Sequence, residues 1–234
     1  MELVLLFVVQ PGLLPLAAQD AEELAKLADE LRARGALRLA GAPLRPEAEA
    51  ARVRVRDGAA RVVAGPFAEA PEVLAGCLAL DVADREAALA VAERCPSARA
   101  GAVEVRPGRV RCGRAPRGAK RFLLLYLLER GAPVPDEARI RQGMAEMRAF
   151  TSELERQGRY LGDGALPPQL PAVRVSVRRG RRAVLDGPFA ESKEVVAGFA
   201  LIEAASREDA IEIAKTVPHA AWGAIEVREL AQPR

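Results

Sequence analysis

Hydrophobic positions along the chain change between two periods, and the same succession of periods occurs twice. In the first half, an unbroken apolar run at 3–9 predicts a buried strand. Leucines at helical spacing within 21–34 then predict an amphipathic helix that ends at Gly35. The other predicted elements of this half are a short strand at 37–39, an alternating hairpin at 52–63, an apolar strand at 73–81, a helix at 84–94 and a strand at 102–106.

Two phrases of the sequence show that this succession is an internal duplication. GPFAEAPEVLAG at 65–76 returns as GPFAESKEVVAG at 187–198, and GAVEVR at 101–106 returns as GAIEVR at 223–228. We therefore expect two domains of one kind, at 1–107 and 120–234. Between them, 108–119 is rich in Gly, Pro and Arg, as is typical of an exposed linker.

The predicted order of elements, β-α-β-hairpin-β-α-β, indicates an α+β fold made of two ferredoxin-like units, each with an inserted hairpin. Such a sheet carries helices on one face only, so its other apolar face must be covered. A second copy in the same chain is the obvious cover. We expect the two sheets to pack face to face as a pseudo-dimer, in a chain that is either a monomer or a dimer of pseudo-dimers.

The 35 basic and 32 acidic residues nearly balance, but the basic excess is concentrated around the linker. Every charged residue between Glu104 and Glu129 is basic, which indicates either a solubilising tether or a contact for an acidic partner or nucleic acid. Because no basic face recurs in the periodic elements, nucleic-acid binding is not expected. The apolar run at 3–9 is too short to span a bilayer and follows no basic residue, so we expect a cytoplasmic protein without membrane contact.

One histidine and three widely spaced cysteines limit the chemistry that the chain can offer. A disulfide framework and a His/Cys metal site are not expected, and no motif indicates a cofactor. Cys77 falls in an apolar strand and should be buried and inert. Cys112 falls in the Arg-rich linker, where exposure and nearby positive charge favour a reactive thiolate.

Differences between the copies single out polar residues of the second copy. Asp186 begins a turn that continues to Phe189, and it is either a turn-forming carboxylate or a general base at the mouth of a pocket. Phe189 is the apolar anchor of that turn. Lys193 is either a solvated member of a charge pair or a contact for an anionic substrate. Where Asp186 and Lys193 stand, the first copy has Ala64 and Pro71.

Three further residues of the second copy complete the candidate site. His219 is either a hydrogen-bonded loop residue or the one side chain suited to acid–base chemistry near neutral pH. Tyr126 can direct a hydroxyl into the fold, and Trp222 either packs in the core or forms the wall of a pocket for an aromatic ligand. The first copy has Ser97 and Phe7 where the second has His219 and Tyr126, so we expect a single, asymmetric site.

The phrase from Asp186 to Glu194, followed by Gly198-Phe199 and the closing GAIEVR, resembles the YCII-related family, also called DGPF-domain proteins. The resemblance implies a bacterial protein and a dimeric α+β barrel formed by two ferredoxin-like units. Some members are small-molecule enzymes, including a dehydrochlorinase that acts on a hydroxylated aromatic compound. Those enzymes resemble one another in a His on the first helix paired with an Asp near the hairpin, whereas the first helices here, at 21–34 and 137–157, contain no His.

Two functions are compatible with these features. The first is a non-catalytic interaction or regulatory protein, which the missing helix His favours; genes of family members are often linked to extracytoplasmic-function sigma factors. The second, which the one-sided polar groups favour, is the binding or transformation of a small organic molecule by acid–base chemistry at a site in the second copy. Its catalytic groups would be Asp186 and His219, and its substrate contacts Lys193, Tyr126, Phe189 and Trp222.

Overall fold

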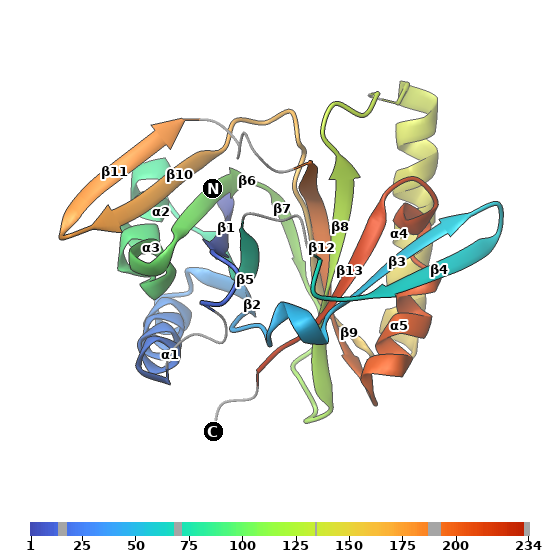
Figure 1. Cartoon of the computed structure of the whole chain (residues 1–234), viewed down its shortest axis with the longest axis horizontal. Coiled ribbons are helices and arrows are strands. Elements are labelled where there is room, and N and C mark those ends of the chain that lie inside the picture. Colours follow the sequence, from blue (N-terminus) through green and yellow to red (C-terminus); the bar gives the residue numbers. More distant parts are fainter. Residues whose placement is uncertain (14–17, 68–71, 134, 187–192, 232–234) are drawn as a thin grey trace.

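The computed structural model describes residues 1–13, 18–67, 72–133, 135–186 and 193–231. They form an α+β fold with two antiparallel sheets (Figure 1). The first copy and the linker contain β1 (Glu2–Val9), α1 (Ala18–Ala33), β2 (Leu37–Gly41), η1 (Glu47–Glu49), β3 (Ala51–Arg56), β4 (Ala59–Ala64), β5 (Val73–Asp81), α2 (Arg85–Arg94), α3 (Pro96–Ala100), β6 (Ala102–Pro107) and β7 (Arg109–Cys112). The second copy contains β8 (Lys120–Glu129), α4 (Glu137–Arg156), β9 (Tyr160–Ala165), β10 (Val173–Arg178), β11 (Arg181–Asp186), β12 (Glu194–Ala204), α5 (Arg207–Lys215), η2 (Pro218–Ala221) and β13 (Ala224–Glu229).

Both sheets repeat the strand order of a split βαβ unit. The first sheet has six strands in the order β11-β10-β6-β1-β5-β2, and the second has seven in the order β4-β3-β13-β8-β12-β9-β7. In each sheet, the first strand of the copy lies between the last strand and the long strand that follows the hairpin. Strand β1 thus has β6 and β5 as neighbours, and β8 has β13 and β12. The strands and helices predicted for the first copy are thus observed, with small shifts of their ends.

The two hairpins are exchanged between the copies, which the sequence did not indicate. Strand β3 of the first copy pairs with β13 of the second, with Val53 opposite Ile225. Strand β10 of the second copy pairs with β6 of the first, with Val175 opposite Val103. Each hairpin therefore extends the other copy's sheet, and the periodicity that predicts a hairpin does not reveal which sheet it joins.

The sheets lie between two layers of helices, as Figure 1 shows, with α1, α2 and α3 on one flank and α4 and α5 on the other. The inner faces share one apolar cluster, to which the first sheet contributes Val4, Leu6 and Cys77 and the second contributes Leu125 and Phe199. Separate clusters pack each outer face against its helices. Burial of the inner faces against each other removes the apolar surface that a single copy would expose to water.

The segment expected to be an exposed linker is docked on the second sheet. Its strand β7 pairs with β9, and Val110 is buried in the inner cluster. Two of its arginines are neutralised within the chain, because Arg111 binds Asp163 and Arg114 binds Glu203. The other two, Arg109 and Arg117, are exposed. None of the helices in the described ranges is long and apolar enough to cross a membrane.

Candidate functional site

Three of the predicted site residues, Tyr126, His219 and Trp222, lie together between the second sheet and α4. The Tyr126 and His219 rings stack with their centroids 5.5 Å apart, and the His219 and Trp222 rings are tilted with centroids 6.0 Å apart. Tyr126 comes from β8, and the other two come from the short turn η2 and the residue after it. The fold therefore unites residues that are far apart in the sequence.

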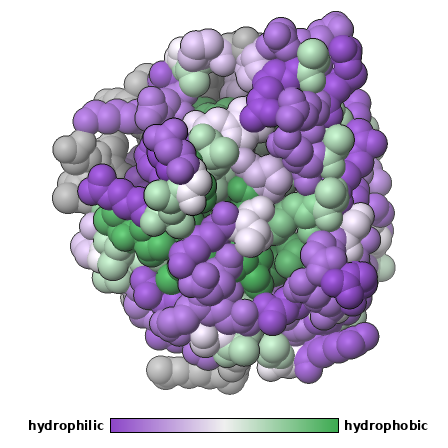
Figure 2. All heavy atoms as spheres, turned by 90° about the vertical axis from the view of Figure 1, so that its right-hand side faces the viewer, coloured by the Kyte–Doolittle hydropathy of each residue, from purple (hydrophilic) through white to green (hydrophobic). Residues whose placement is uncertain are grey.

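The position of Trp222 follows from local features of the chain. Pro218 begins the turn η2, and its carbonyl oxygen accepts a hydrogen bond of 2.8 Å from Trp222 Nε1. Gly143 faces the ring from α4, where a Cβ atom would lie 2.8 Å from it. The Arg139 guanidinium covers the ring at 4.7 Å from the centroid, which is cation–π geometry. Figure 2 shows this flank of the molecule, which is mainly hydrophilic with a smaller hydrophobic area among the polar side chains.

His219 is held as a neutral imidazole. Its Nε2 lies 3.0 Å from the Leu127 carbonyl oxygen, which can only accept, so Nε2 carries the proton. Burial lowers the pKa of His219, and the hydrogen bond to Leu127 opposes this only in part. Nδ1 is left as a proton acceptor without a hydrogen-bond partner among the described residues.

Two buried phenols lie on this face of the second sheet, and the Tyr126 hydroxyl has no hydrogen-bond partner among the described residues. They belong to Tyr126 and Tyr160, which are 7% and 1% exposed. Burial raises the pKa of both phenols, and the carboxylate of Asp163 raises it further. Both remain protonated near neutral pH and can donate a hydrogen bond to a ligand.

Asp163 is fixed by Arg111, whose Nη2 lies 2.7 Å from its Oδ2 and 2.7 Å from the Thr151 hydroxyl. The strand register places Asp163 opposite Ala200, on the same face of the sheet as Tyr126. Asp163 and Tyr160 were not predicted from the sequence. The signal for Asp163 was a carboxylate between two glycines. We call Tyr126, Tyr160, Asp163, His219 and Trp222 the second-copy cluster.

The first copy has no such cluster. Strand register and repeat alignment put the following residues at the positions of Tyr126, Tyr160, Asp163, His219 and Trp222, in that order: Phe7, Leu37, Ala40, Ser97 and Ala100. The polar groups between helix and sheet are therefore specific to the second copy.

Asp186 and Lys193 lie elsewhere. Asp186 ends β11, which belongs to the first sheet, and its exposed carboxylate pairs with Arg85 at 2.9 Å. Lys193 is exposed just before β12, and its carbonyl oxygen accepts a hydrogen bond of 2.8 Å from the Arg130 amide. Phe189 is outside the described residues. The hairpin exchange thus carries Asp186 to a different sheet from His219, and the six predicted residues do not form one constellation.

The GPF phrase of the first copy can be followed in detail up to Phe67. The Gly65 amide donates to the Ala50 carbonyl at 3.0 Å, and the Phe67 amide donates to Glu47 Oε1 at 3.4 Å. A Cβ on Gly65 would lie 2.2 Å from the Glu47 carbonyl oxygen, so only glycine fits there. The phrase therefore docks the end of its hairpin against the turn η1.

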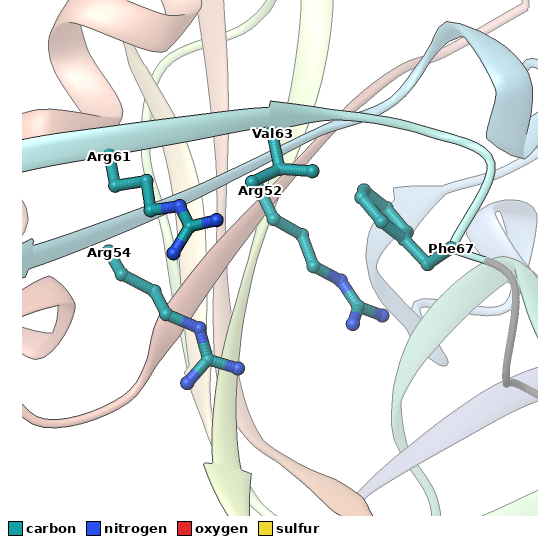
Figure 3. A pocket seen from close by; sticks show the side chains of 5 residues that line it. All are labelled: Arg52, Arg54, Arg61, Val63 and Phe67. Carbon is teal, nitrogen blue, oxygen red and sulfur yellow. The ribbon is translucent and has the colours of Figure 1, made fainter.

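A cleft of about 220 Å³ opens beside this turn, lined by Arg52, Arg54, Arg61, Val63 and Phe67. Figure 3 shows the three guanidinium groups on one side of the β3–β4 hairpin, with Phe67 beside Arg52. The Arg52 guanidinium lies 4.0 Å from the centroid of the Phe67 ring. We call these five residues the arginine cleft. Within the described ranges, no group of three or more His, Cys, Asp or Glu side chains could hold a metal ion.

Comparison with known proteins agrees with the duplicated architecture. The model of the YCII-related domain matches the chain twice, over 1–109 and 125–233. The chain belongs to the YCII-related family. The chain is similar to an uncharacterized protein of Rhizobium meliloti (strain 1021), with 34% identity over 90 residues that cover 38% of this chain and 73% of the relative. The resemblance and the tandem duplication inferred from the repeated phrases are confirmed.

Proposed function

We propose that this YCII-related protein binds a small organic molecule at the second-copy cluster and that His219 accepts a proton from it. The observation that carries the proposal is the buried hydroxyl group of Tyr126, which has no hydrogen-bond partner among the described residues. Buried polar groups without partners are costly and rare, so a ligand that accepts a hydrogen bond from this hydroxyl would recover free energy. The cluster is confined to one copy, as a functional site in a duplicated chain can be.

The proposed chemistry follows from the protonation states. Neutral His219 offers Nδ1 as the acceptor, while the phenol of Tyr126 offers a hydrogen bond to an oxygen that becomes negative as the proton leaves. Trp222 supplies a flat, partly exposed wall for an aromatic or unsaturated ligand. Asp186 is not part of this site, since it lies on the other sheet. We also infer that the two sheets close into the dimeric α+β barrel implied by the family resemblance.

The test is a calorimetric titration of the full chain with a panel of phenols and small organic acids. We expect at least one compound to bind saturably, and His219→Gln or Tyr126→Phe to weaken it about tenfold, which corresponds to the loss of one hydrogen bond in a buried site. Ser97→Ala, at the position of His219 in the first copy, is the matched control and should leave the affinity unchanged. Equal weakening by all three variants, with folding intact, would refute the proposal.

A second function, as an interaction protein, is supported by a different feature. Strands β4 and β11 form the outer edges of the two sheets, and all their residues are exposed. Leu185 is 63% exposed and Val63 44%. Open edges with apolar side chains accept a further strand. Light scattering over a range of concentrations tests this reading for self-association, and a Leu185→Lys variant should abolish any dimer that forms through β11.

A further inference from the structure

The arginine cleft of the first hairpin lies well away from the second-copy cluster, on the opposite face of the second sheet. Arg54 is paired directly across the hairpin with Arg61, and Arg52 with Val63. Because alternate residues of a strand share a face, these four side chains point to one side. Arg52 is also opposite Glu226 of β13, so their side chains share one face of the sheet. The cleft therefore extends the inner face of the second sheet beyond β13, over the exchanged hairpin.

Two of the three arginines are held in place by carboxylates of the second copy. Arg52 binds Glu226 through Nε at 3.0 Å and Nη2 at 2.9 Å, and its Nη1 lies 2.9 Å from Glu194. Arg54 reaches the other oxygen of Glu194 at 2.6 Å. These contacts fix the guanidinium groups before any ligand arrives, as a preorganised site requires.

The third arginine has no ion-pair partner among the described residues, although it faces another cation. Arg61 stands directly opposite Arg54, and like charges facing each other destabilise an antiparallel pair. The charge of Arg54 is balanced by Glu194 and, at 3.5 Å, by Glu129, so Arg61 supplies the unbalanced charge of the pair. A bound anion between the two guanidinium groups would neutralise Arg61 and accept charge-assisted hydrogen bonds.

The opposite end of the cleft is apolar. The Phe67 ring lies 4.0 Å from the Arg52 guanidinium, its backbone amide donates to Glu47, and Val63 is 44% exposed. A cleft of about 220 Å³ is smaller than the sites that hold drug-sized ligands, so it suits one compact molecule. The lining combines a cationic end with an aromatic end.

Comparison with the second hairpin shows which of these arginines the hairpin exchange itself requires. Its Arg174 matches Arg52 and binds Glu72 at 2.5 Å, as Arg52 binds Glu194. At the positions of Arg54 and Arg61, however, it has Ser176 and Ala183. The exchanged hairpin thus needs the first arginine only, and the Arg54–Arg61 pair is an addition of the first copy.

We propose that the arginine cleft binds a small oxyanion, a carboxylate or a phosphate monoester, attached to a flat apolar group. Arg54 and Arg61 bind the anionic oxygens, and the apolar group lies against Phe67 and Val63. This site is independent of the proposed function, because its residues are distinct from those of the second-copy cluster.

The experiment is calorimetry on the full chain at low ionic strength, with benzoate, phenyl phosphate and inorganic phosphate as probes. We expect benzoate, phenyl phosphate or both to bind saturably and more tightly than inorganic phosphate, which cannot use the apolar wall. Binding of benzoate alone assigns the anion as a carboxylate, and binding of phenyl phosphate alone assigns it as a phosphate monoester. Added salt should weaken the binding, since partly exposed charges are screened.

Arg61→Ala should reduce the affinity about tenfold, which corresponds to the loss of one charge-assisted hydrogen bond. Arg181→Ala removes an equal charge from the other hairpin and is the matched control, so its affinity should match that of the unaltered chain. Equal loss in both variants would mean a general charge effect and overturn the proposal. The absence of saturable binding by benzoate and phenyl phosphate to the unaltered chain would also overturn it, as would inorganic phosphate binding as tightly as phenyl phosphate.

Discussion

The two copies share their strand order, their exchanged hairpins and their anchoring contacts, yet they differ in the polar groups of the second-copy cluster and of the arginine cleft. In both copies, an arginine at the end of the first hairpin strand, which is β3 or β10, donates hydrogen bonds to backbone carbonyls of the other copy. Arg56 donates to the Ala220 oxygen at 3.0 Å, and Arg178 donates to the Gly101 oxygen at 2.8 Å. Contacts that occur in both copies hold the duplicated fold together, and groups present in one copy only are available for function.

By this comparison, the second copy carries the buried phenols and the histidine, whereas the first carries the paired arginines of its hairpin. The GPF phrase belongs to the shared set, because the first copy retains it without the preceding aspartate and uses it to dock a hairpin end. Divergence after duplication has therefore left the framework alone and altered the side chains around it.

Separating the copies should have the largest effect. A chain cleaved within 108–119 places each hairpin on a different polypeptide from the half-sheet that it extends. We expect the isolated halves, 1–107 and 120–234, to re-associate or aggregate, because each alone exposes its inner apolar face. Size-exclusion chromatography with light scattering measures the outcome.

The matched comparison mixes the two purified halves, which should restore a species with the mass of the whole chain. Two soluble, independently stable monomers would contradict this account of the interface. They would show that each half can fold its hairpin onto its own sheet.

A smaller effect is expected from two equivalent glutamates. Glu226 accepts hydrogen bonds from Arg52 and, at 3.1 Å, from Arg228. Its counterpart Glu104 is equally buried and lies 3.6 Å from Arg106, and burial raises its pKa although Arg106, Arg174 and Arg130 oppose this. Replacing Glu226 by Gln should cost about 2 kcal/mol, because buried arginines lose their charged acceptor.

Glu104→Gln is the control for this prediction and should cost less than about 1 kcal/mol, since the neutral amide resembles the form that burial already favours. Denaturant unfolding of both variants measures the difference. Equal costs would show that the two copies do not differ at this contact.

The sequence predicted the secondary structure and the duplication well, because both depend on local periodicity and on repeated phrases. Strand 73–81 was predicted with the observed ends, and the hairpin within one residue at each end. The exchange of hairpins was missed for a physical reason. A strand such as β3 presents the same alternating pattern to either sheet, and the choice depends on long-range pairs such as Val53 with Ile225.

The same exchange explains why the candidate site was predicted only in part. Tyr126, His219 and Trp222 belong to elements that stay with their own sheet, so grouping them by copy succeeded. Asp186 belongs to the hairpin, so membership of the second copy did not place it near His219. Asp163 was not predicted because its partner Arg111 lies on β7, a strand in the segment that was expected to be a linker.

Acidic pH should lower the free energy of unfolding through His219, a residue that has no counterpart histidine in the first copy. Its pKa is lowered by burial in the folded chain, so below its ordinary value of 6.5 the unfolded chain takes up a proton that the folded chain resists. The free energy of unfolding should therefore fall as the pH decreases through 6.5 and stop responding to this group below its folded pKa.

Thermal unfolding across pH 5–8 measures this effect as the difference between the unaltered chain and His219→Gln, which keeps a donor for the Leu127 carbonyl. All other titrating groups are common to both chains and cancel. A constant difference across the range would mean that His219 is not desolvated in the folded state.

The thiols should show the difference between core and linker without any change in stability. Cys77 replaces the second copy's Phe199 in the inner cluster, and burial raises its pKa to about 12. Cys95 is also buried, with a pKa raised to about 12, whereas Cys112 on β7 is exposed.

Because the thiolate is the reactive form and access is required, a maleimide should label Cys112 alone in the native chain and all three cysteines in denaturant. Peptide mass spectrometry identifies the labelled site, and a Cys112→Ser variant should remain unlabelled over the same time. Native labelling of Cys77 at a comparable rate would mean that the two sheets separate readily, which would contradict the sealed inner cluster that the copies form together.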